Sequence, residues 1–312
     1  MDKTLYELVV IGAGVAGLSA AQYGARANLR TLVLEEMAAG GQALLIDQLE
    51  NYPGILEPVS GYDLAETMRQ QAERFGAEFR TTSVSKVEKS GEIFSIHTDE
   101  GPVEALAVIL ATGAKHRHLG VPGEEAFIGR GVSYCATCDG PFFKGKRMLV
   151  VGGGDAACDE AQYLAKLSDK ILMIHRKDRF RAQKALAERV LSNPAIHVSF
   201  TTVALEIKGT KKVESVVLQD LVTGEKREEP VDAVFVFIGS DPNTAIAPDC
   251  AKDDTRSIIT DEKMQTSVPG LFAAGDVRVS PFRQIVTSAS DGAVAAHAAS
   301  QYIDELKGSA YR

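Results

Sequence analysis

Two glycine-rich turns with the same spacing restrict the fold of this chain more than any other feature. GAGVAG (Gly12–Gly17) follows the apolar run Leu5–Ile11 and precedes an alanine-rich helical pattern. GGGDAA (Gly152–Ala157) follows the apolar run Arg147–Val151 in the same way. In each copy a further apolar run follows, Thr31–Leu34 and Ile171–Ile174, and the residue directly after it, Glu35 or His175, lies 23 positions after the first glycine. A strand, a glycine turn, a helix and a second strand in this order predict a dinucleotide-binding unit, here present twice.

The repeat predicts an α/β fold of two Rossmann-like, three-layer domains, the second inserted in the first. Two turn-rich segments, Gly113–Pro122 and Gly239–Asn243, read as linkers. Beyond the second linker there is no new glycine turn, so Leu271–Asp276 and the small-residue helix expected at Ser288–Ser300 are assigned to the first domain. The predicted domains are 1–116 with 245–312, and 117–244. Two parallel connections of this kind can act as a hinge.

Composition excludes several classes of protein. The chain has 312 residues and a formal net charge of −8 with no long basic run, which argues against nucleic acid as a partner. The longest apolar run, Ala105–Ala111, is far shorter than the roughly 18 residues of a membrane span. The N-terminus does not resemble a signal peptide. Four cysteines are too few for a disulfide scaffold, so we expect a cytoplasmic protein with no membrane partner.

The residues after the second strand of each unit predict different nucleotides. Glu35 can accept hydrogen bonds from free ribose hydroxyls and would repel a 2′-phosphate, which favours FAD or NAD at the first site. The second unit has His175 at this position, followed by Arg176, Lys177 and Arg181. Three fixed positive charges suit the 2′-phosphate of NADPH. The alternative for this second segment is a solvated basic turn.

A Cys-x-x-Cys pair, Cys135 and Cys138, lies between the first linker and the second glycine turn. Such a pair can close a small redox-active disulfide. A zinc site would need two further ligands, and Cys158 and Cys250 are single and distant in sequence. Two inert thiols are the remaining alternative. Asp139 is either a general acid for a leaving thiolate or a turn residue before Gly140.

Together these motifs closely resemble the low-molecular-weight thioredoxin reductases over essentially the whole chain. CATCDG between two nucleotide turns is the most specific element of the resemblance. The matching segments are GAGVAG (Gly12–Gly17), GGQ (Gly40–Gln42), ENYPG (Glu50–Gly54), ATGA (Ala111–Ala114), CATCDG (Cys135–Gly140), GGGDAA (Gly152–Ala157), HRKDRFR (His175–Arg181), AAGD (Ala273–Asp276) and FRQIVTSASDG (Phe282–Gly292).

The resemblance implies a homodimeric, NADPH-dependent thioredoxin-disulfide reductase with non-covalent FAD in the first domain and NADPH in the second. Cys138 would meet the flavin, Cys135 would attack thioredoxin, and Asp139 would act as the acid, so no metal is expected. The residues expected to bind FAD are Gly12, Gly14, Ala16, Gly17, Glu35, Glu36, Gly41, Gln42, Asn51, Ala111, Thr112, Gly113, Gly275, Asp276, Arg283, Gln284 and Ile285. Those expected to bind NADPH are Gly152, Gly154, Asp155, Ala156, His175, Arg176, Lys177, Arg181 and Gly239.

Two points qualify the resemblance. Lys177 stands where the family usually has a second arginine, and lysine keeps the charge but not the planar fork, which predicts a softer preference for NADPH. A flavin-dependent dithiol oxidase of the same fold is the second enzyme hypothesis, although it does not need the intact second nucleotide site. A redox-sensing or zinc-holding module is the non-enzymatic hypothesis.

Overall fold

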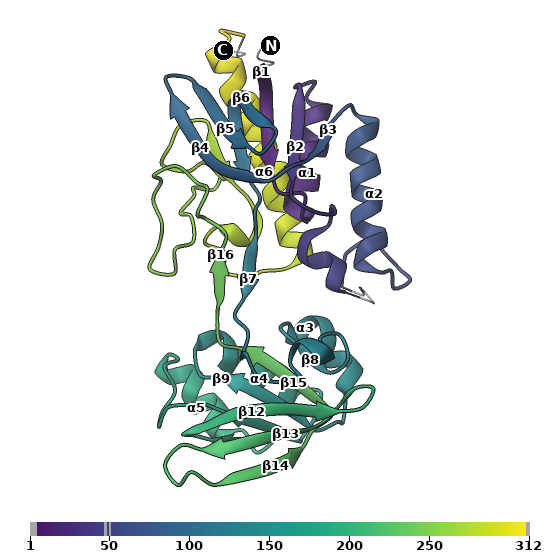
Figure 1. The fold of residues 1–312 in the computed structure, drawn as a ribbon, viewed down its shortest axis with the longest axis vertical. Coiled ribbons are helices and arrows are strands. Elements are labelled where there is room, and N and C mark those ends of the chain that lie inside the picture. The colour runs from purple at the N-terminus through teal and green to yellow at the C-terminus, as the bar shows by residue number, and fades with distance from the viewer. Residues whose placement is uncertain (1–4, 47–48, 50, 310–312) are drawn as a thin grey trace. The chain divides into compact units, whose positions relative to one another are not determined.

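The computed structural model describes residues 5–46, 49 and 51–309, which form two compact units (Figure 1). Unit 1 comprises Met1–Lys115 and Asp241–Arg312, and unit 2 comprises His116–Ser240. Glu50, the first residue of the matched segment ENYPG, lies outside the described residues. No helix in the described ranges is long and apolar enough to cross a membrane.

Unit 1 is built on a sheet whose central strand is β1 (Leu5–Ile11). β1 lies between β2 and β6 and runs parallel to both. The order along the sheet is β3-β2-β1-β6-β5-β4, with β17 also pairing with β6. The bounds of the other strands are β2 Thr31–Glu35, β3 Glu78–Thr81, β4 Val84–Ser90, β5 Ile93–Thr98, β6 Gly101–Leu110 and β17 Leu271–Ala273. Since β17 returns to this sheet, unit 2 is an insertion in unit 1, as the sequence predicted.

Three helices accompany this sheet: α1 (Val15–Arg26), α2 (Gly61–Arg74) and α6 (Ile285–Leu306). α1 and α6 pack closely, and a Cβ added at Gly292 of α6 would collide with the carbonyl oxygen of Ala16. α6 is longer at both ends than the predicted Ser288–Ser300. It begins earlier because Gln284 and Thr287 form a capping box that the hydrophobic pattern does not reveal.

Unit 2 contains a five-stranded parallel sheet, in the order β11-β10-β9-β15-β8. These strands are β8 Val132–Ser133, β9 Met148–Gly152, β10 Ile171–Ile174, β11 Ile196–Ser199 and β15 Ala233–Phe237, and the helices are α3 Ala136–Asp139, α4 Asp155–Ala165 and α5 Lys184–Ser192. A three-stranded antiparallel sheet completes the unit, with β12 Thr202–Gly209, β13 Val213–Asp220 and β14 Lys226–Pro230. Apolar side chains of both sheets form one core, including Leu149, Val216 and Val234. The sheet of unit 1 is mixed, because β5 pairs antiparallel with both β4 and β6, whereas the five-stranded sheet of unit 2 is parallel throughout. Two α/β units with parallel strands at the centre of each sheet confirm the predicted fold class.

Each predicted linker contains a short strand. β7 (Ala114–His116) and β16 (Ser240–Pro242) pair with each other. Next to them in unit 1, the Asn243 N–H donates to the Gly113 carbonyl at 3.0 Å. On the other side, within unit 2, the Arg117 N–H donates to the Gly239 carbonyl at 2.9 Å. The two connections therefore run side by side.

Candidate functional site

The first glycine turn joins β1 to α1. Gly12 has φ +100°, and a Cβ there would collide with the carbonyl oxygen of Ala111 at the end of β6. A Cβ at Gly17 would collide with the Gly12 carbonyl. Gly14 differs, because an added Cβ would meet no atom within 4 Å. Gly12 and Gly17 are therefore needed for close packing, whereas Gly14 leaves open space at the N-terminus of α1, where backbone N–H groups can bind a phosphate.

Glu35 at the end of β2 is attached to this turn. Its Oε2 accepts a hydrogen bond from the Ala13 N–H at 2.6 Å, and its Oε1 accepts one from the Met37 N–H at 3.0 Å. Each carboxylate oxygen has a further lone pair, so the group can still accept from a ribose hydroxyl. Glu36, the next predicted residue, is exposed.

The segment after β2 also reaches the turn. Gly41 begins the 3₁₀ helix η1 (Gly41–Leu45), and its φ of +55° favours glycine. An added Cβ would also lie 3.2 Å from the Gly14 Cα, which is a tight contact. The Gln42 side chain donates to the carbonyl of Ala114. The Asn51 amide donates to Gln284 Oε1 at 3.1 Å, which joins this segment to the start of α6.

Thr112 and Gly113, which follow β6, are held by a residue that the sequence did not single out. The Thr112 hydroxyl donates to the Asn243 carbonyl at 2.7 Å, and the Asn243 side-chain amide donates back to the Thr112 carbonyl at 2.8 Å. These residues are 131 positions apart, so only the fold reveals the pair.

The AAGD segment completes the arrangement in unit 1. Gly275 has φ +75°, and a Cβ there would lie 3.0 Å from the Ala16 Cβ at the start of α1. Asp276 follows in the 3₁₀ helix η4 (Gly275–Val277). Burial raises the pKa of Asp276, and the nearby charge of Arg283 acts in the opposite direction. Arg283, Gln284 and Ile285 stand at the beginning of α6. The predicted residues of the first site therefore gather at the carboxyl end of the sheet.

The second glycine turn, between β9 and α4, repeats this geometry within unit 2. A Cβ added at Gly152 would collide with the carbonyl oxygen of Phe237 at the end of β15, just as a Cβ added at Gly12 would collide with that of Ala111. An added Cβ at Gly154 would meet nothing within 4 Å, as at Gly14. Both turns thus leave the middle glycine facing open space in front of a helix, and both fit the pyrophosphate of a dinucleotide.

His175 and the basic residues after it fold back onto this turn. The His175 ring packs on Gly153, and the Arg181 N–H donates to the Gly153 carbonyl at 2.7 Å. Burial lowers the pKa of His175, and the charges of Arg181, Arg176 and Lys177 lower it further. The three cationic side chains are exposed, and a solvated phosphate could therefore reach them.

The other residues predicted for the second site have different surroundings. Asp155 begins α4, and its carboxylate accepts the Gln183 N–H at 2.7 Å and the Gln183 side-chain amide at 3.0 Å. It therefore fixes the start of α5, a role that the sequence did not predict. Ala156 is exposed in the first turn of α4. Gly239 accepts the Arg117 N–H as described above.

Cys135 and Cys138 form a disulfide in unit 2, with their Cα atoms 5.4 Å apart. The Cys138 N–H donates to Cys135 Sγ at 3.2 Å, so Cys135 caps the short helix α3. The Ser133 hydroxyl accepts the Cys135 N–H at 3.1 Å. Asp139 is the last residue of α3, directly after Cys138.

The remaining cysteines are of a different kind. Cys158 and Cys250 are buried free thiols. Burial raises the pKa of Cys158 to about 11 and also raises that of Cys250. A thiol that stays protonated is a poor nucleophile, so neither residue is suited to exchange chemistry.

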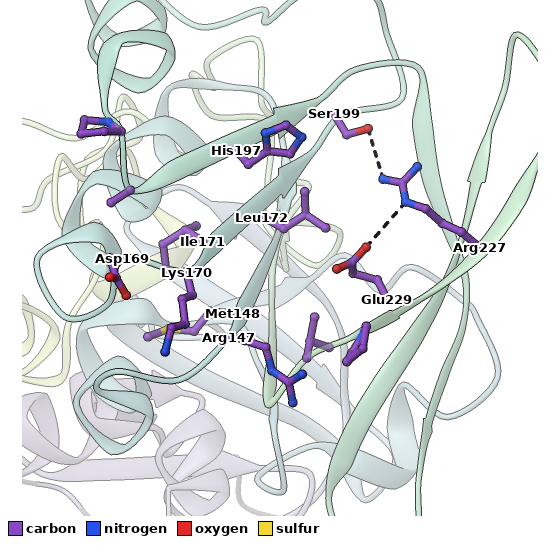
Figure 2. A pocket seen from close by; sticks show the side chains of 14 residues that line it. Arg147, Met148, Asp169, Lys170, Ile171, Leu172, His197, Ser199, Arg227 and Glu229 are labelled. Carbon is purple, nitrogen blue, oxygen red and sulfur yellow. Dashed lines mark hydrogen bonds and ion pairs between the residues drawn. The ribbon is translucent and has the colours of Figure 1, made fainter.

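Unit 2 also has a cavity of about 550 Å³, which lies away from its glycine turn. Figure 2 shows Arg147, Lys170 and His197 around it, near the amino ends of β9, β10 and β11. Arg227 on β14 bonds Ser199 at 3.5 Å and Glu229 at 3.6 Å across one side. None of the glycine-turn residues lines this cavity, although Ser199 at the carboxyl end of β11 does.

Comparison with known proteins agrees with this geometry. Residues 6–300 match the pyridine nucleotide-disulphide oxidoreductase family. The chain belongs to this family. It is 57% identical to a thioredoxin reductase of Treponema pallidum, over 98% of this chain and 99% of the relative. It is 43% identical to a thioredoxin reductase of Peptoclostridium acidaminophilum, over 97% of this chain and 98% of the relative. The crystal structure of thioredoxin reductase from Streptococcus pyogenes superimposes with a TM-score of 0.92 at 42% identity, covering 97% and 100% of the two chains.

These similarities confirm the resemblance to thioredoxin reductases that the motifs predicted. Together with the Cys135–Cys138 disulfide, they confirm an oxidoreductase that acts through a disulfide. Membership of the pyridine nucleotide-disulphide oxidoreductase family implies a nicotinamide and a flavin cofactor. The two open glycine turns fit such dinucleotides, one in each unit.

Proposed function

We propose that this chain is an NADPH-dependent thioredoxin-disulfide reductase. Unit 1 binds FAD, unit 2 binds NADPH, and the Cys135–Cys138 disulfide passes the electrons to thioredoxin. The observation that best supports this proposal is the disulfide itself, which forms in a unit that also carries a dinucleotide turn. When bound, the cofactors would supply hydride transfer from the nicotinamide and two-electron transfer through the flavin.

In unit 1 the residues around the first glycine turn would hold FAD. Gly14 leaves room for the pyrophosphate at the N-terminus of α1, and Glu35 can accept from the hydroxyls of the adenosine ribose. The positive end of α6, which begins at Ile285, favours negative charge on a flavin ring placed there. None of the predicted residues is a cysteine or histidine positioned for a covalent flavin link.

In unit 2 the corresponding residues would hold NADPH. Gly154 provides the open position for the pyrophosphate, as Gly14 does in unit 1. The exposed side chains of Arg176, Lys177 and Arg181 would bind the 2′-phosphate by charge-assisted hydrogen bonds. Lys177 contributes a single ammonium group in place of a planar fork, so discrimination against NADH rests mainly on the two arginines.

The cysteines would exchange electrons with thioredoxin in two displacements. Reduction of the Cys135–Cys138 bond by two electrons gives two thiol groups. The Cys135 thiolate then attacks one sulfur of the thioredoxin disulfide and expels the other as a thiolate. The Cys138 thiolate next attacks Cys135, which releases the second thioredoxin sulfur and restores the disulfide. The two protons that the Cys135 and Cys138 thiols lose as they form thiolates balance the two that the released thioredoxin sulfurs take up. Asp139 would relay one of them to a leaving thiolate and be reprotonated, so that thioredoxin gains two electrons and two protons in total.

The finer assignments of partner, assembly and location are part of the same proposal. Thioredoxin is the protein substrate, because the relatives at 57% and 43% identity are thioredoxin reductases. A homodimer follows from the family resemblance. A cytoplasmic location is supported by Cys158 and Cys250, which stay as free thiols in the same chain as the active disulfide.

The proposal is tested with the purified holoenzyme and two sets of variants. NADPH should bleach the flavin absorbance of wild type, and added thioredoxin should restore it. Cys135→Ser should accept electrons from NADPH but fail to reduce thioredoxin. The matched controls Cys158→Ser and Cys250→Ser, which change buried thiols outside the site, should keep the activity.

Two outcomes would contradict the proposal. Reduction of thioredoxin by Cys135→Ser would remove Cys135 from the reaction. Oxidation of a small dithiol with oxygen uptake, together with no response to NADPH, would support the dithiol oxidase instead. Denaturation should also release all the yellow colour, because colour retained on the precipitated protein would indicate a covalent flavin.

A further inference from the structure

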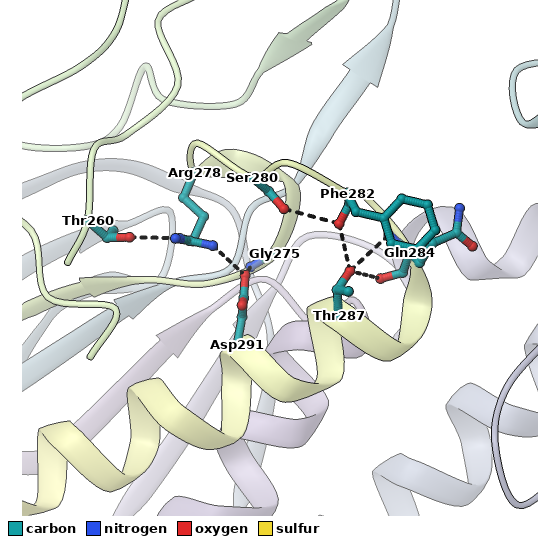
Figure 3. Close-up of polar contacts among 8 residues, drawn as sticks. All are labelled: Thr260, Gly275, Arg278, Ser280, Phe282, Gln284, Thr287 and Asp291. Carbon is teal, nitrogen blue, oxygen red and sulfur yellow. Dashed lines mark hydrogen bonds and ion pairs between the residues drawn. The ribbon is translucent and has the colours of Figure 1, made fainter. Parts of the chain in front are cut away.

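An ion pair fixes the AAGD turn of unit 1, and it joins Arg278, which lies outside the sequence motifs, to Asp291 near the end of FRQIVTSASDG. Asp291 Oδ2 accepts a hydrogen bond from the Gly275 N–H at 3.1 Å and pairs with Arg278 Nη1 at 3.1 Å. Arg278 Nε donates to the Thr260 hydroxyl at 2.7 Å, as Figure 3 shows. The side chains of Arg278 and Asp291 are each only 14% exposed. The side chains of the pair formed by Arg69 and Glu66 in the same unit are, by comparison, 33% and 31% exposed.

The AAGD turn depends on the hydrogen bond between the Gly275 N–H and Asp291, because Gly275 has no side chain that could restrain its backbone. Its φ of +75° is open to glycine and strained for other residues, and an added Cβ would lie 3.0 Å from the Ala16 Cβ, closer than an ordinary contact. The hydrogen bond from its N–H to Asp291 restrains this conformation. Asp291 is itself fixed along α6, since the next residue, Gly292, packs directly on the Ala16 carbonyl.

Charge is the second part of the arrangement. Asp276 follows Gly275, and burial is the main reason for its raised pKa, with the negative charge of Asp291 adding to it. Arg278 neutralises Asp291 at 3.1 Å, which limits this repulsion. The pair therefore holds the backbone beside Asp276 without adding a second net negative charge there.

We propose that Arg278 and Asp291 are positioning residues for the flavin, which hold the Gly275–Asp276 turn in the conformation that binds FAD. Neither residue needs to touch the cofactor. The inference rests on the proposed function, because it takes FAD as the ligand of unit 1. A merely structural ion pair would instead stabilise unit 1 and leave its affinity for FAD unchanged.

The test measures FAD binding to flavin-free protein by fluorescence quenching, together with the thermal midpoint of each apoprotein. Asp291→Ala removes both the acceptor for Gly275 and the partner of Arg278, and should raise the dissociation constant for FAD about ten- to a hundredfold. Asp291→Asn keeps an oxygen that can accept the Gly275 N–H and should lie between this variant and wild type. Glu66→Gln is the matched control, because it breaks a carboxylate–arginine pair with Arg69 in the same unit, outside the predicted site.

If Asp291→Ala does not fold, the dissociation constant for FAD is measured in Arg278→Lys and Thr260→Val instead. Lysine retains the charge but cannot bond Asp291 and Thr260 with one planar fork, so FAD binding should weaken by a few-fold. Wild-type affinity for FAD in Asp291→Ala would overturn the inference even if the thermal midpoint fell. If Asp291→Ala does not fold, wild-type affinity in both Arg278→Lys and Thr260→Val would overturn it. Failure of wild-type apoprotein to bind FAD would be a different result, which overturns the proposed function and this inference with it.

Discussion

The imidazole of His175 packs directly on the backbone of Gly153. An added Cβ at Gly153 would overlap the ring, and the ring Nε2 is buried with no hydrogen-bond partner among the described residues. Burial and three nearby cations lower the pKa of His175, so the ring is neutral at pH 7. The second glycine turn and His175, which follows β10, therefore pack as one local structure. This contact explains why GGGDAA and HRKDRFR occur at a fixed spacing.

Gly153→Ala and Gly154→Ala should therefore fail in different ways. At Gly153 the new methyl group must displace the His175 ring, which should cost about 1–3 kcal/mol of stability. At Gly154 the methyl group meets no protein atom within 4 Å, so stability should stay within about 0.5 kcal/mol of wild type. The Gly154 variant should nevertheless bind NADPH poorly, because its methyl group occupies the space proposed for the pyrophosphate. Thermal midpoints and NADPH titrations measure the two effects, and wild-type NADPH affinity in Gly154→Ala would contradict the proposed site.

Arg181→Ala should separate recognition of the 2′-phosphate from the structure of the turn. The Arg181 N–H bonds the Gly153 carbonyl, and this backbone contact survives the substitution. Loss of one charge-assisted hydrogen bond should raise the KM for NADPH about ten- to a hundredfold and leave that for NADH nearly unchanged. Steady-state kinetics with both nucleotides measure this. Equal damage with the two would mean that Arg181 is structural.

Lys177→Arg is the converse change at the neighbouring cation. A planar guanidinium can bond a phosphate through two N–H groups, so the ratio of kcat/KM for NADPH to that for NADH should rise. An unchanged ratio would mean that Lys177 does not contact the phosphate.

The sequence predicted the parts of the site that depend on local pattern. Gly12, Gly14 and Gly17 lie where the spacing placed them, because a strand–turn–helix requires small residues at fixed offsets. The sheet β12-β13-β14 was not anticipated, since antiparallel strands of this kind carry no motif. Asn243 and Asp291 lie in the second linker and in FRQIVTSASDG, but neither was predicted as a site residue. Their partners Thr112 and Gly275 are 131 and 16 positions away, and only the folded chain brings them together.

Glu124 is a further residue that the pattern concealed. It is 1% exposed, and its carboxylate accepts N–H groups of Leu119 and Gly120 at 2.8 Å and the Tyr134 hydroxyl at 2.9 Å. Tyr134→Phe removes one hydrogen bond to this charge and should lower the stability of unit 2 by about 1.5–3 kcal/mol. Thermal denaturation measures the loss, and Tyr163→Phe in the same unit is a control without a hydrogen bond to Glu124. Equal effects of the two substitutions would show that the Tyr134–Glu124 contact adds no stability.

Glu160 should make the stability of unit 2 depend on pH. It lies on α4, three and four residues before Tyr163 and Leu164, whose side chains stand against Gly140. One carboxyl oxygen is buried without a hydrogen-bond partner in the described structure. Burial, and then the charge of Asp159, raise the pKa of Glu160 from 4.5 to about 7.

The raised pKa of Glu160 determines whether stability rises or falls with pH. Between pH 4.5 and about 7 the folded protein holds a proton that the unfolded chain has lost, so this group's contribution to stability falls as the pH rises and levels off above about 7. Allowing for the solvent that still reaches the side chain, the fall should be about 1–2 kcal/mol. Glu160→Gln cannot lose a proton, so its thermal midpoint relative to wild type should rise by a few degrees between pH 5 and pH 8. Glu188→Gln, which changes an exposed carboxylate on α5, should show no such trend. A difference between Glu160→Gln and wild type that stays constant with pH would mean that Glu160 is ionised throughout this range.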